Sequence, residues 1–273
     1  MRVGVEYITL LGIGPLEMIA CAAAAECRDI SLVLSRPDFN PYDYPFFSLI
    51  DDARLRRETV ASLRDNNVSI ALVDGFAVFP GSDAAQQRPA FDVLAELGVK
   101  RINAISFDPA RARSLDQIGE IVTMAGSYGI TATMEPCPML TFKTLAEVLE
   151  VIEAVALPNF KLLIDTMHLT RVGDTAADLA RLDPQLIDYV QLSDGPSVIA
   201  DPFNYMDEAM NERMIPGDGD MPLVDILRAV RADLVVSVEV PMRSLAQAGV
   251  SAQERVQRAV AGARRVIASA AQT

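Results

Sequence analysis

Several residue types are scarce in this 273-residue sequence, and each scarcity excludes a kind of site. Cysteine occurs only at Cys21, Cys27 and Cys137, an odd number without the spacing of metal-ligating cysteines. This usage predicts a reducing compartment, the cytoplasm, with neither a disulfide framework nor a zinc–thiolate site. Histidine occurs once, at His168, so a metal centre built from several histidines is also excluded.

Positive charge is scarce too. The 24 lysines and arginines are outnumbered by 37 aspartates and glutamates, which leaves a formal net charge of -13. Such an acidic chain repels nucleic-acid phosphates and anionic membrane surfaces. No stretch approaches the ~20 apolar residues that would span a bilayer, and Glu6 and Glu17 interrupt an N-terminal stretch that faintly resembles a signal peptide. We therefore expect a small-molecule partner, with neither nucleic acid nor membrane bound, and homo-oligomer formation stays open.

The hydrophobic pattern alternates between strand length and helix length from one end of the chain to the other. Short apolar runs are followed by amphipathic stretches, some closed by a glycine such as Gly98 or Gly129. Eight such pairs without a break in composition predict an α/β fold, a single (β/α)8 TIM barrel over residues 1–273. An open doubly wound sheet is the alternative, but no G-x-G-x-x-G turn supports it. The expected strands are 2–7, 30–34, 69–73, 101–107, 131–135, 161–164, 187–192 and 234–240, and the expected helices are 15–26, 51–66, 84–97, 114–128, 144–156, 176–182, 223–231 and 252–269.

Two long loops interrupt this alternation, at residues 35–47 and 193–221. The first is rich in proline and aromatic residues, too polar for a core segment. Long loops that follow barrel strands are often functional, so we expect both to lie near a site.

Polar side chains stand at the carboxyl ends of four consecutive predicted strands, at Glu135, Asp165, Gln191 and Glu239. A parallel barrel brings such ends together at one rim. Three converging carboxylates repel one another in a low-dielectric cavity unless they are protonated or bind a cation. Because all four ligands offer oxygen, one Mn²⁺ or Mg²⁺ ion is expected first, with Co²⁺ or Zn²⁺ as alternatives. A single acid of this kind more often caps a helix or pairs with an arginine, but four in succession favour the metal.

The four strand ends, with Asp165-x-x-His168 and the segment Arg213-Met-Ile-Pro-Gly-Asp-Gly219, resemble the xylose isomerase-like superfamily of sugar (phosphate) isomerases and epimerases. The resemblance covers nearly the whole chain. It implies that the four strand-end residues hold one divalent metal ion and that His168 and Arg213 contact the substrate. Gln191 departs from the pattern, in which histidine is commoner, although inosose dehydratases of the superfamily also have glutamine there. The DNA endonucleases of this superfamily are not matched, because they need several histidines.

A metal ion that bridges a carbonyl and the adjacent hydroxyl group of a sugar-like substrate stabilises an enediolate. Glu135 or Glu239 could then act as the catalytic base that removes the proton alpha to the carbonyl. We therefore expect a metal-dependent isomerase or epimerase that acts on a sugar or sugar phosphate, a small polyhydroxy carbonyl compound. The alternative, favoured by Gln191, is a dehydratase of an inosose or dehydroshikimate-like hydroxy-ketone. A catalytically inactive binding module is disfavoured because neither a ligand nor a base is missing.

Three arginines, Arg171, Arg213 and Arg243, follow the last three strands and suggest that the substrate carries an anionic group. Their rival interpretation is pairing with surface acids. His168 has a rival interpretation as well, as a histidine satisfied at the start of a helix. Asp194 is expected either to orient Gln191 or to cap the following loop.

Overall fold

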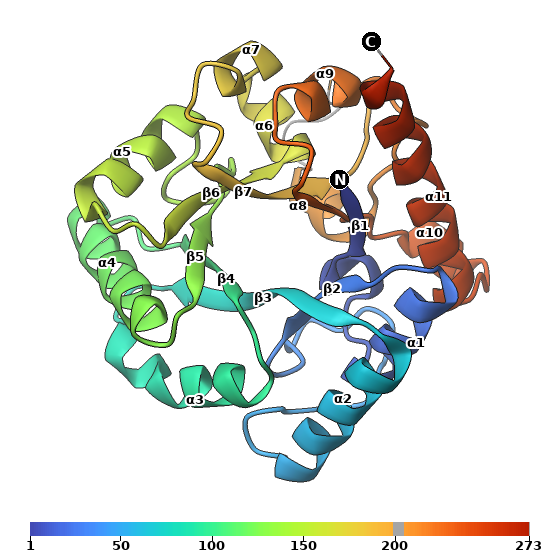
Figure 1. Cartoon of the computed structure of the whole chain (residues 1–273), viewed down its shortest axis with the longest axis horizontal. Helices are drawn as coiled ribbons and strands as arrows, with labels where there is room; N and C mark the ends of the chain where they lie inside the picture. The colour runs from blue at the N-terminus through green and yellow to red at the C-terminus, as the bar shows by residue number, and fades with distance from the viewer. Residues whose placement is uncertain (199–204, 273) are drawn as a thin grey trace.

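Eight apolar segments form one closed barrel of parallel strands in the computed structural model, which describes residues 1–198 and 205–272. Each strand pairs with the next along the chain, and the first closes on the last (Figure 1). The predicted TIM-barrel fold is therefore confirmed. The strands are β1 (Arg2–Val5), β2 (Asp29–Val33), β3 (Ser69–Val78), β4 (Arg101–Ser106), β5 (Thr131–Met134), β6 (Phe160–Asp165), β7 (Ile187–Leu192) and β8 (Val235–Val238).

Helices surround the barrel and cover the outer faces of the strands (Figure 1). None of the described helices is long and apolar enough to cross a membrane. The helices are η1 (Tyr7–Leu10), α1 (Pro15–Ala24), α2 (Ala53–Asn66), η2 (Ala84–Gln87), α3 (Arg88–Glu96), α4 (Arg111–Ser127), α5 (Leu145–Val155), α6 (Thr166–Val172), α7 (Ala176–Leu179), α8 (Tyr205–Asn211), α9 (Leu223–Arg228), α10 (Arg243–Gln247) and α11 (Ala252–Ala271).

All eight expected strands and the main helices are present, but four short helices were not predicted. These are η1, α6, α8 and α10, which follow the ends of β1, β6, β7 and β8. Each has seven residues or fewer, too short for a 3.6-residue hydrophobic period to show. The expected loop 193–221 is therefore partly wrong, since α8 lies within it, while residues 199–204 are outside the described part of the chain.

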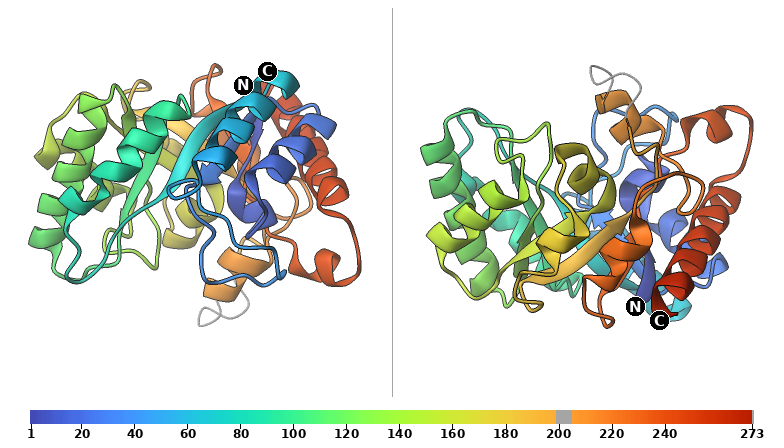
Figure 2. Two further views of the ribbon diagram at one scale, coloured as in Figure 1. Left: turned by 90° about the horizontal axis from the view of Figure 1, so that it is seen from below. Right: turned by 90° about the horizontal axis from the view of Figure 1, so that it is seen from above.

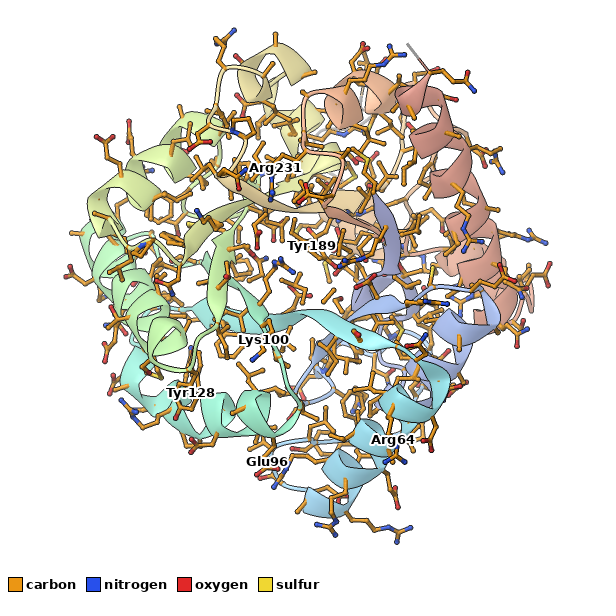
Figure 3. The ribbon with its side chains drawn as sticks, viewed as in Figure 1. Arg64, Glu96, Lys100, Tyr128, Tyr189 and Arg231 are labelled. Carbon is orange, nitrogen blue, oxygen red and sulfur yellow. The ribbon has the colours of Figure 1, made fainter. Side chains whose placement is uncertain are left out.

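The barrel interior holds its own small apolar cluster, separate from the larger core between strands and helices. Tyr189 of β7 is fully buried in this cluster, and Figure 3 shows it inside the ring of strands. The chain termini lie at one end of the barrel (Figure 2). The loop 35–47 and α8 lie at the other end, where the carboxyl ends of the strands point. Unpredicted short helices and long loops thus surround the predicted rim.

The segment after Arg213 is held in place by α11. Gly262 faces this segment, and a Cβ atom at this position would lie 2.5 Å from Ile215 Cγ2 and 2.7 Å from the Pro216 carbonyl oxygen. Backbone contact this close leaves no room for a side chain. The long closing helix therefore positions the loop that carries Arg213.

We predict that two glycine-to-alanine changes in helices have opposite effects on the free energy of unfolding. Gly262→Ala should lower the free energy of unfolding by roughly 1–3 kcal/mol because the methyl group overpacks the contact with Pro216. Gly119→Ala in α4, where the new Cβ meets only ordinary contact at 3.8 Å, should raise it by up to about 1 kcal/mol. Urea unfolding of both variants measures the difference. Equal stability of Gly262→Ala and the unaltered protein would contradict the packing argument.

Candidate active site

The four predicted strand-end residues meet at the carboxyl rim. Asp165 closes β6 and stands in register with Gln191 of β7, while Glu135 and Glu239 directly follow β5 and β8. All four are buried. Because parallel strands end at one edge, residues spread over more than 100 positions of the sequence converge on one small volume.

One cation lies between two of these acids. The Nη1 atom of Arg213 donates to Asp165 Oδ2 and to Glu239 Oε2, both at 2.7 Å. Its Nε atom donates to the Ala209 carbonyl oxygen at 2.8 Å, which fixes the plane of the guanidinium group. Arg213 is 5% exposed, so this contact is screened little by water.

The two acids that share Arg213 respond differently to it. Burial opposes ionisation of Asp165, but attraction to Arg213 and His168 outweighs it and holds the pKa of Asp165 below its ordinary value. For Glu239 burial prevails over Arg213, and repulsion from Asp165 adds to it, so the pKa of Glu239 is raised. The pair therefore favours one ionised and one protonated carboxyl group beside the guanidinium.

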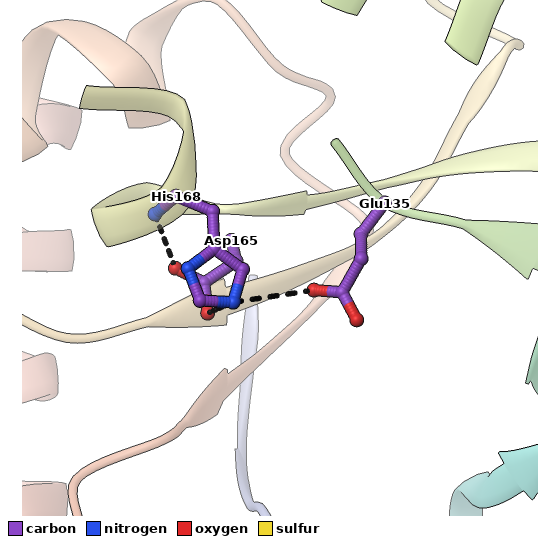
Figure 4. A group of neighbouring side chains, drawn as sticks. All are labelled: Glu135, Asp165 and His168. Carbon is purple, nitrogen blue, oxygen red and sulfur yellow. Dashed lines mark hydrogen bonds and ion pairs between the residues drawn. The ribbon is translucent and has the colours of Figure 1, made fainter. Parts of the chain in front are cut away.

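Glu135 points its carboxyl group toward His168 and Asp165, which overlap in the view of Figure 4. Its Oε1 accepts a hydrogen bond from Asn103 Nδ2 at 2.8 Å, and its Oε2 is 3.8 Å from His168 Nε2. Burial, with repulsion from Asp165, raises the pKa of Glu135 to about 8. A carboxyl group that titrates near neutral pH is suited to give and take protons.

His168 lies in the first turn of α6, which Asp165 caps. Oδ1 of Asp165 accepts hydrogen bonds from the backbone N–H groups of Met167 and His168 at 2.7 and 2.9 Å. The ring Nε2 is 3.5 Å from Asp165 Oδ2, and Nδ1 is hydrogen-bonded to the Tyr205 hydroxyl group. Burial lowers the pKa of His168 to about 4, against the attraction of Asp165, so the ring is neutral at pH 7. His168 therefore lies at the start of a helix, as its rival interpretation expects, and also faces the acids, while its contact with substrate stays a prediction.

A second group of polar side chains near these residues was not predicted from the sequence. Glu6, which follows β1, accepts hydrogen bonds from Tyr189 Oη at 2.6 Å and from Gln191 Nε2 at 3.4 Å. Asp74 in β3 lines a cavity together with Glu135 and His168, and burial raises its pKa well above the ordinary value. Asn103, which holds Glu135, was missed as well. An isolated acid within an apolar strand was the available signal for Glu6 and Asp74.

Two of the three predicted substrate arginines are engaged elsewhere. Arg171 contacts Glu208 through two nitrogens, and Arg243 contacts Asp207 through two hydrogen bonds of 2.7 Å. Neither lines the cavity beside the acids, whereas Arg213 does. The geometry thus matches the rival interpretation, pairing with acids, for Arg171 and Arg243.

Asp194 holds the loop that carries Arg213. Its carboxylate accepts hydrogen bonds from the backbone N–H groups of Gly195, Gly217 and Met221. A Cβ atom at residue 219 would lie 2.5 Å from Asp194 Oδ1, so only glycine allows this approach. Of the two predicted roles of Asp194, the structure shows loop capping.

The donor groups fit a divalent metal ion. Ligand atoms of Glu135, Asp165 and His168 lie within 4.8 Å of one another. The buried Oε1 of Gln191 has no hydrogen-bond partner within the described part of the chain. An unpartnered amide oxygen beside carboxylates suits a hard cation. Arg213 already supplies one positive charge between Asp165 and Glu239, so a metal ion bound by these oxygens would share them with the guanidinium or displace it.

A cavity of about 290 Å³ opens from these residues toward the rim. Glu135, His168, Arg213 and Glu239 are among its lining residues. These four side chains thus stand in a pocket that a small molecule can enter.

Comparison with known proteins agrees with this fold. A family model described as xylose isomerase-like TIM barrel matches residues 20–266. The structure of an IolI protein with a bound zinc atom superposes with a TM-score of 0.81 over 100% of both chains at 18% sequence identity. D-psicose 3-epimerase from Clostridium cellulolyticum H10, solved with D-tagatose, gives 0.72 over 97% of this chain and 98% of that one at 15% identity. A xylose isomerase domain protein from Alicyclobacillus acidocaldarius gives 0.71 over 99% of each chain at 20% identity. No curated protein matches the sequence.

We predict that the purified protein takes up about one Mn²⁺ or Mg²⁺ ion per chain and that Asp165→Ala and Glu239→Ala each abolish uptake, since each removes an oxygen ligand. Elemental analysis after dialysis measures the metal content. Asp188→Ala, which removes an acid paired with Arg101, is the matched control and should retain full uptake. Full occupancy in the Asp165/Glu239 double variant, or tight binding of zinc alone, would refute the assignment.

We also predict a pH-dependent stability effect of Glu135 in metal-free protein. Its pKa is raised from 4.5 to about 8 in the folded state. The contribution of neutral Glu135 to the free energy of unfolding is therefore fully present below pH 4.5 and is lost as the pH rises through 8. Glu135→Gln removes this loss. The melting temperature of the variant, relative to the unaltered protein, should therefore rise steadily between pH 5 and 8. Exposed Glu153→Gln is the control and should show a flat difference, and a flat difference for Glu135→Gln would contradict the burial argument.

Proposed function

This chain belongs to the family of xylose isomerase-like TIM barrels, and we propose that it is a metal-dependent sugar or sugar-phosphate isomerase or epimerase. The observation that carries the proposal is the pair of buried glutamates, Glu135 and Glu239, which line one cavity together with His168 and Arg213. Burial raises the carboxyl pKa of both above the ordinary value in the metal-free protein, so both are suited to accept a proton. The buried, free thiols of the chain agree with the proposed cytoplasmic location.

Glu135, Asp165, Gln191 and Glu239 would hold one divalent ion, Mn²⁺ or Mg²⁺ first, and His168 is a further candidate ligand. When bound, such an ion polarises the substrate carbonyl and lowers the pKa of the adjacent C–H and O–H groups. IolI is similar in fold and its structure contains zinc, which supports a metal at this rim without fixing its identity.

The chain's own residues would then move the proton. The carboxylate of Glu135 or Glu239 removes the proton alpha to the carbonyl, and the same or the opposite glutamate returns it. Return to the neighbouring carbon gives isomerisation, and return to the opposite face gives epimerisation. Arg213 holds the position of Glu239 and would supply positive charge at the cavity wall, which can stabilise negative charge that develops on the substrate.

Dehydration of an inosose or dehydroshikimate-like hydroxy-ketone is the second candidate. Its support is Gln191, because inosose dehydratases of the superfamily also have glutamine at this position. A protonated carboxyl group can protonate a departing β-hydroxyl group after the α proton has been removed.

The test is exchange of the substrate's α proton with D₂O in metal-loaded protein. We predict that Glu135→Gln and Glu239→Gln each reduce turnover by about 10²–10⁴-fold, because glutamine keeps the size and a coordinating oxygen but cannot act as base. An epimerase variant should still exchange the proton on the face served by its remaining glutamate. Glu153→Gln is the matched control. If neither variant loses more than about tenfold, the carboxylates are not the bases and another group, such as His168, moves the proton.

A further inference from the structure

We propose that the substrate is an uncharged hydroxy-ketone whose part beyond the reacting carbons is apolar, such as a single aromatic or alicyclic ring, in place of the polyhydroxylated or phosphorylated part of a sugar or sugar phosphate. The assignment of the hydroxy-ketone end rests on the proposed function. The assignment of an apolar remainder, the part of the substrate beyond the reacting carbons, rests on separate observations of the cavity wall.

The first observation is the sorting of polar and apolar groups along the cavity. Its imidazole and charged lining residues include Glu135, His168, Arg213 and Glu239, all of which are buried. The remaining wall is built by apolar side chains that come from four different parts of the rim. They include Ile8, Leu11, Ile105, Phe107, Met139 and Met206.

The second observation concerns partners for substrate hydroxyl groups. No serine, threonine, asparagine, glutamine or lysine lines this cavity among the residues that the structure describes. Besides the buried acids and Arg213, hydrogen-bonding side chains are offered by Asp74, Tyr7 and Tyr205, and the hydroxyl of Tyr205 is hydrogen-bonded to His168. A polyhydroxylated chain against the apolar part of this wall would lose more hydrogen bonds to water than it gains from these few groups, which disfavours its binding.

The third observation concerns charge. Arg213 is the one cationic side chain among the described lining residues, and Asp165 and Glu239 already accept its hydrogen bonds. Arg171 and Arg243 pair with acids outside the cavity. A phosphate or carboxylate group on the distal part of the substrate would therefore meet apolar side chains, at a large desolvation cost.

The fourth observation is the outlet of the cavity. Phe107 stacks on Phe79 with ring centroids 5.2 Å apart and planes 7° apart, and the two rings are 40% and 52% exposed. Met139 and Met206, which line the same cavity, are exposed to a similar degree. Partly exposed lining residues of this kind, Phe107, Met139 and Met206, suit contact with a flat apolar ring.

The cavity size limits the apolar part. A volume of about 290 Å³ lies at the small end of the range usual for ligand sites, roughly 300–1,000 Å³. One ring beside a two- or three-carbon hydroxy-ketone fits this range better than a long chain or a fused ring system.

The experiment compares four ketones in metal-loaded protein: 2-hydroxyacetophenone, D-fructose, dihydroxyacetone and dihydroxyacetone phosphate. All four carry the same reacting group and differ in the remainder. The readouts are kcat/KM for α-proton exchange and, independently of turnover, binding followed by ligand-observed NMR. We expect kcat/KM for the aryl ketone to exceed that for the fructose and phosphate compounds by at least about tenfold, the usual value of one well-packed apolar group.

Two wall variants sharpen the comparison. Phe107→Ala and Met139→Gln should each reduce the preference for the aryl ketone over dihydroxyacetone by about fivefold or more, since both remove apolar contact. Val60→Ala, an exposed apolar residue of α2 outside the cavity, is the control and should leave the preference unchanged. An unchanged preference in both wall variants would overturn the proposal.

The outcomes separate this proposal from the proposed function. Exchange that is as fast on fructose or on the phosphate as on the aryl ketone overturns the apolar remainder and leaves the function standing. If no ketone exchanges, the function fails, and binding decides the present proposal. Binding of the aryl ketone alone then supports it, and equal or absent binding overturns it. Self-association that Phe107→Ala abolishes, without aryl-ketone binding, would instead identify the apolar rim as a contact between chains and overturn the proposal.

Discussion

The site depends on one guanidinium nitrogen that two buried carboxyl groups share. Without a cation, the negative charges of Asp165 and Glu239 would repel each other in a region from which water is largely excluded. Arg213 Nη1 lies 2.7 Å from both carboxyl groups, and its positive charge offsets the repulsion between them. Two contacts fix the position of the segment that carries this nitrogen. Asp194 accepts backbone hydrogen bonds from the loop after β7, and α11 packs against the residues that follow Arg213.

The barrel and the residues at its last four strand ends could be predicted because both follow from short-range patterns. A buried parallel strand is a run of apolar residues in the sequence. Its end is marked by the first polar residue that, by the alternation of side chains along a strand, faces the barrel interior. Asp165, Gln191 and their neighbours on β5 and β8 are identified in this way. Parallel topology then places these ends at one rim without any knowledge of long-range contacts.

The partners of side chains could not be predicted in the same way. Arg171 and Arg243 follow strand ends, as Arg213 does, but their partners Glu208 and Asp207 lie in α8. This helix has seven residues, too few for a hydrophobic period, so neither it nor its acids could be placed beside the arginines. Glu6 could not be predicted either. An acid within an apolar stretch indicates only that the hydrophobic pattern is broken there. The hydrogen-bond partners of Glu6, Tyr189 and Gln191, lie far along the chain.

Asp165 has a consequence for the way relatives of this protein are compared. One oxygen of its carboxylate caps α6, and the other contacts Arg213 and faces His168. Selection for the fold alone would therefore retain aspartate, or asparagine as an equally good cap, at this position even in a descendant that no longer catalyses a reaction. Its retention is thus weak grounds for assigning activity to a homologue. Glu135 and Glu239, which cap no helix in the described structure, are the more informative positions.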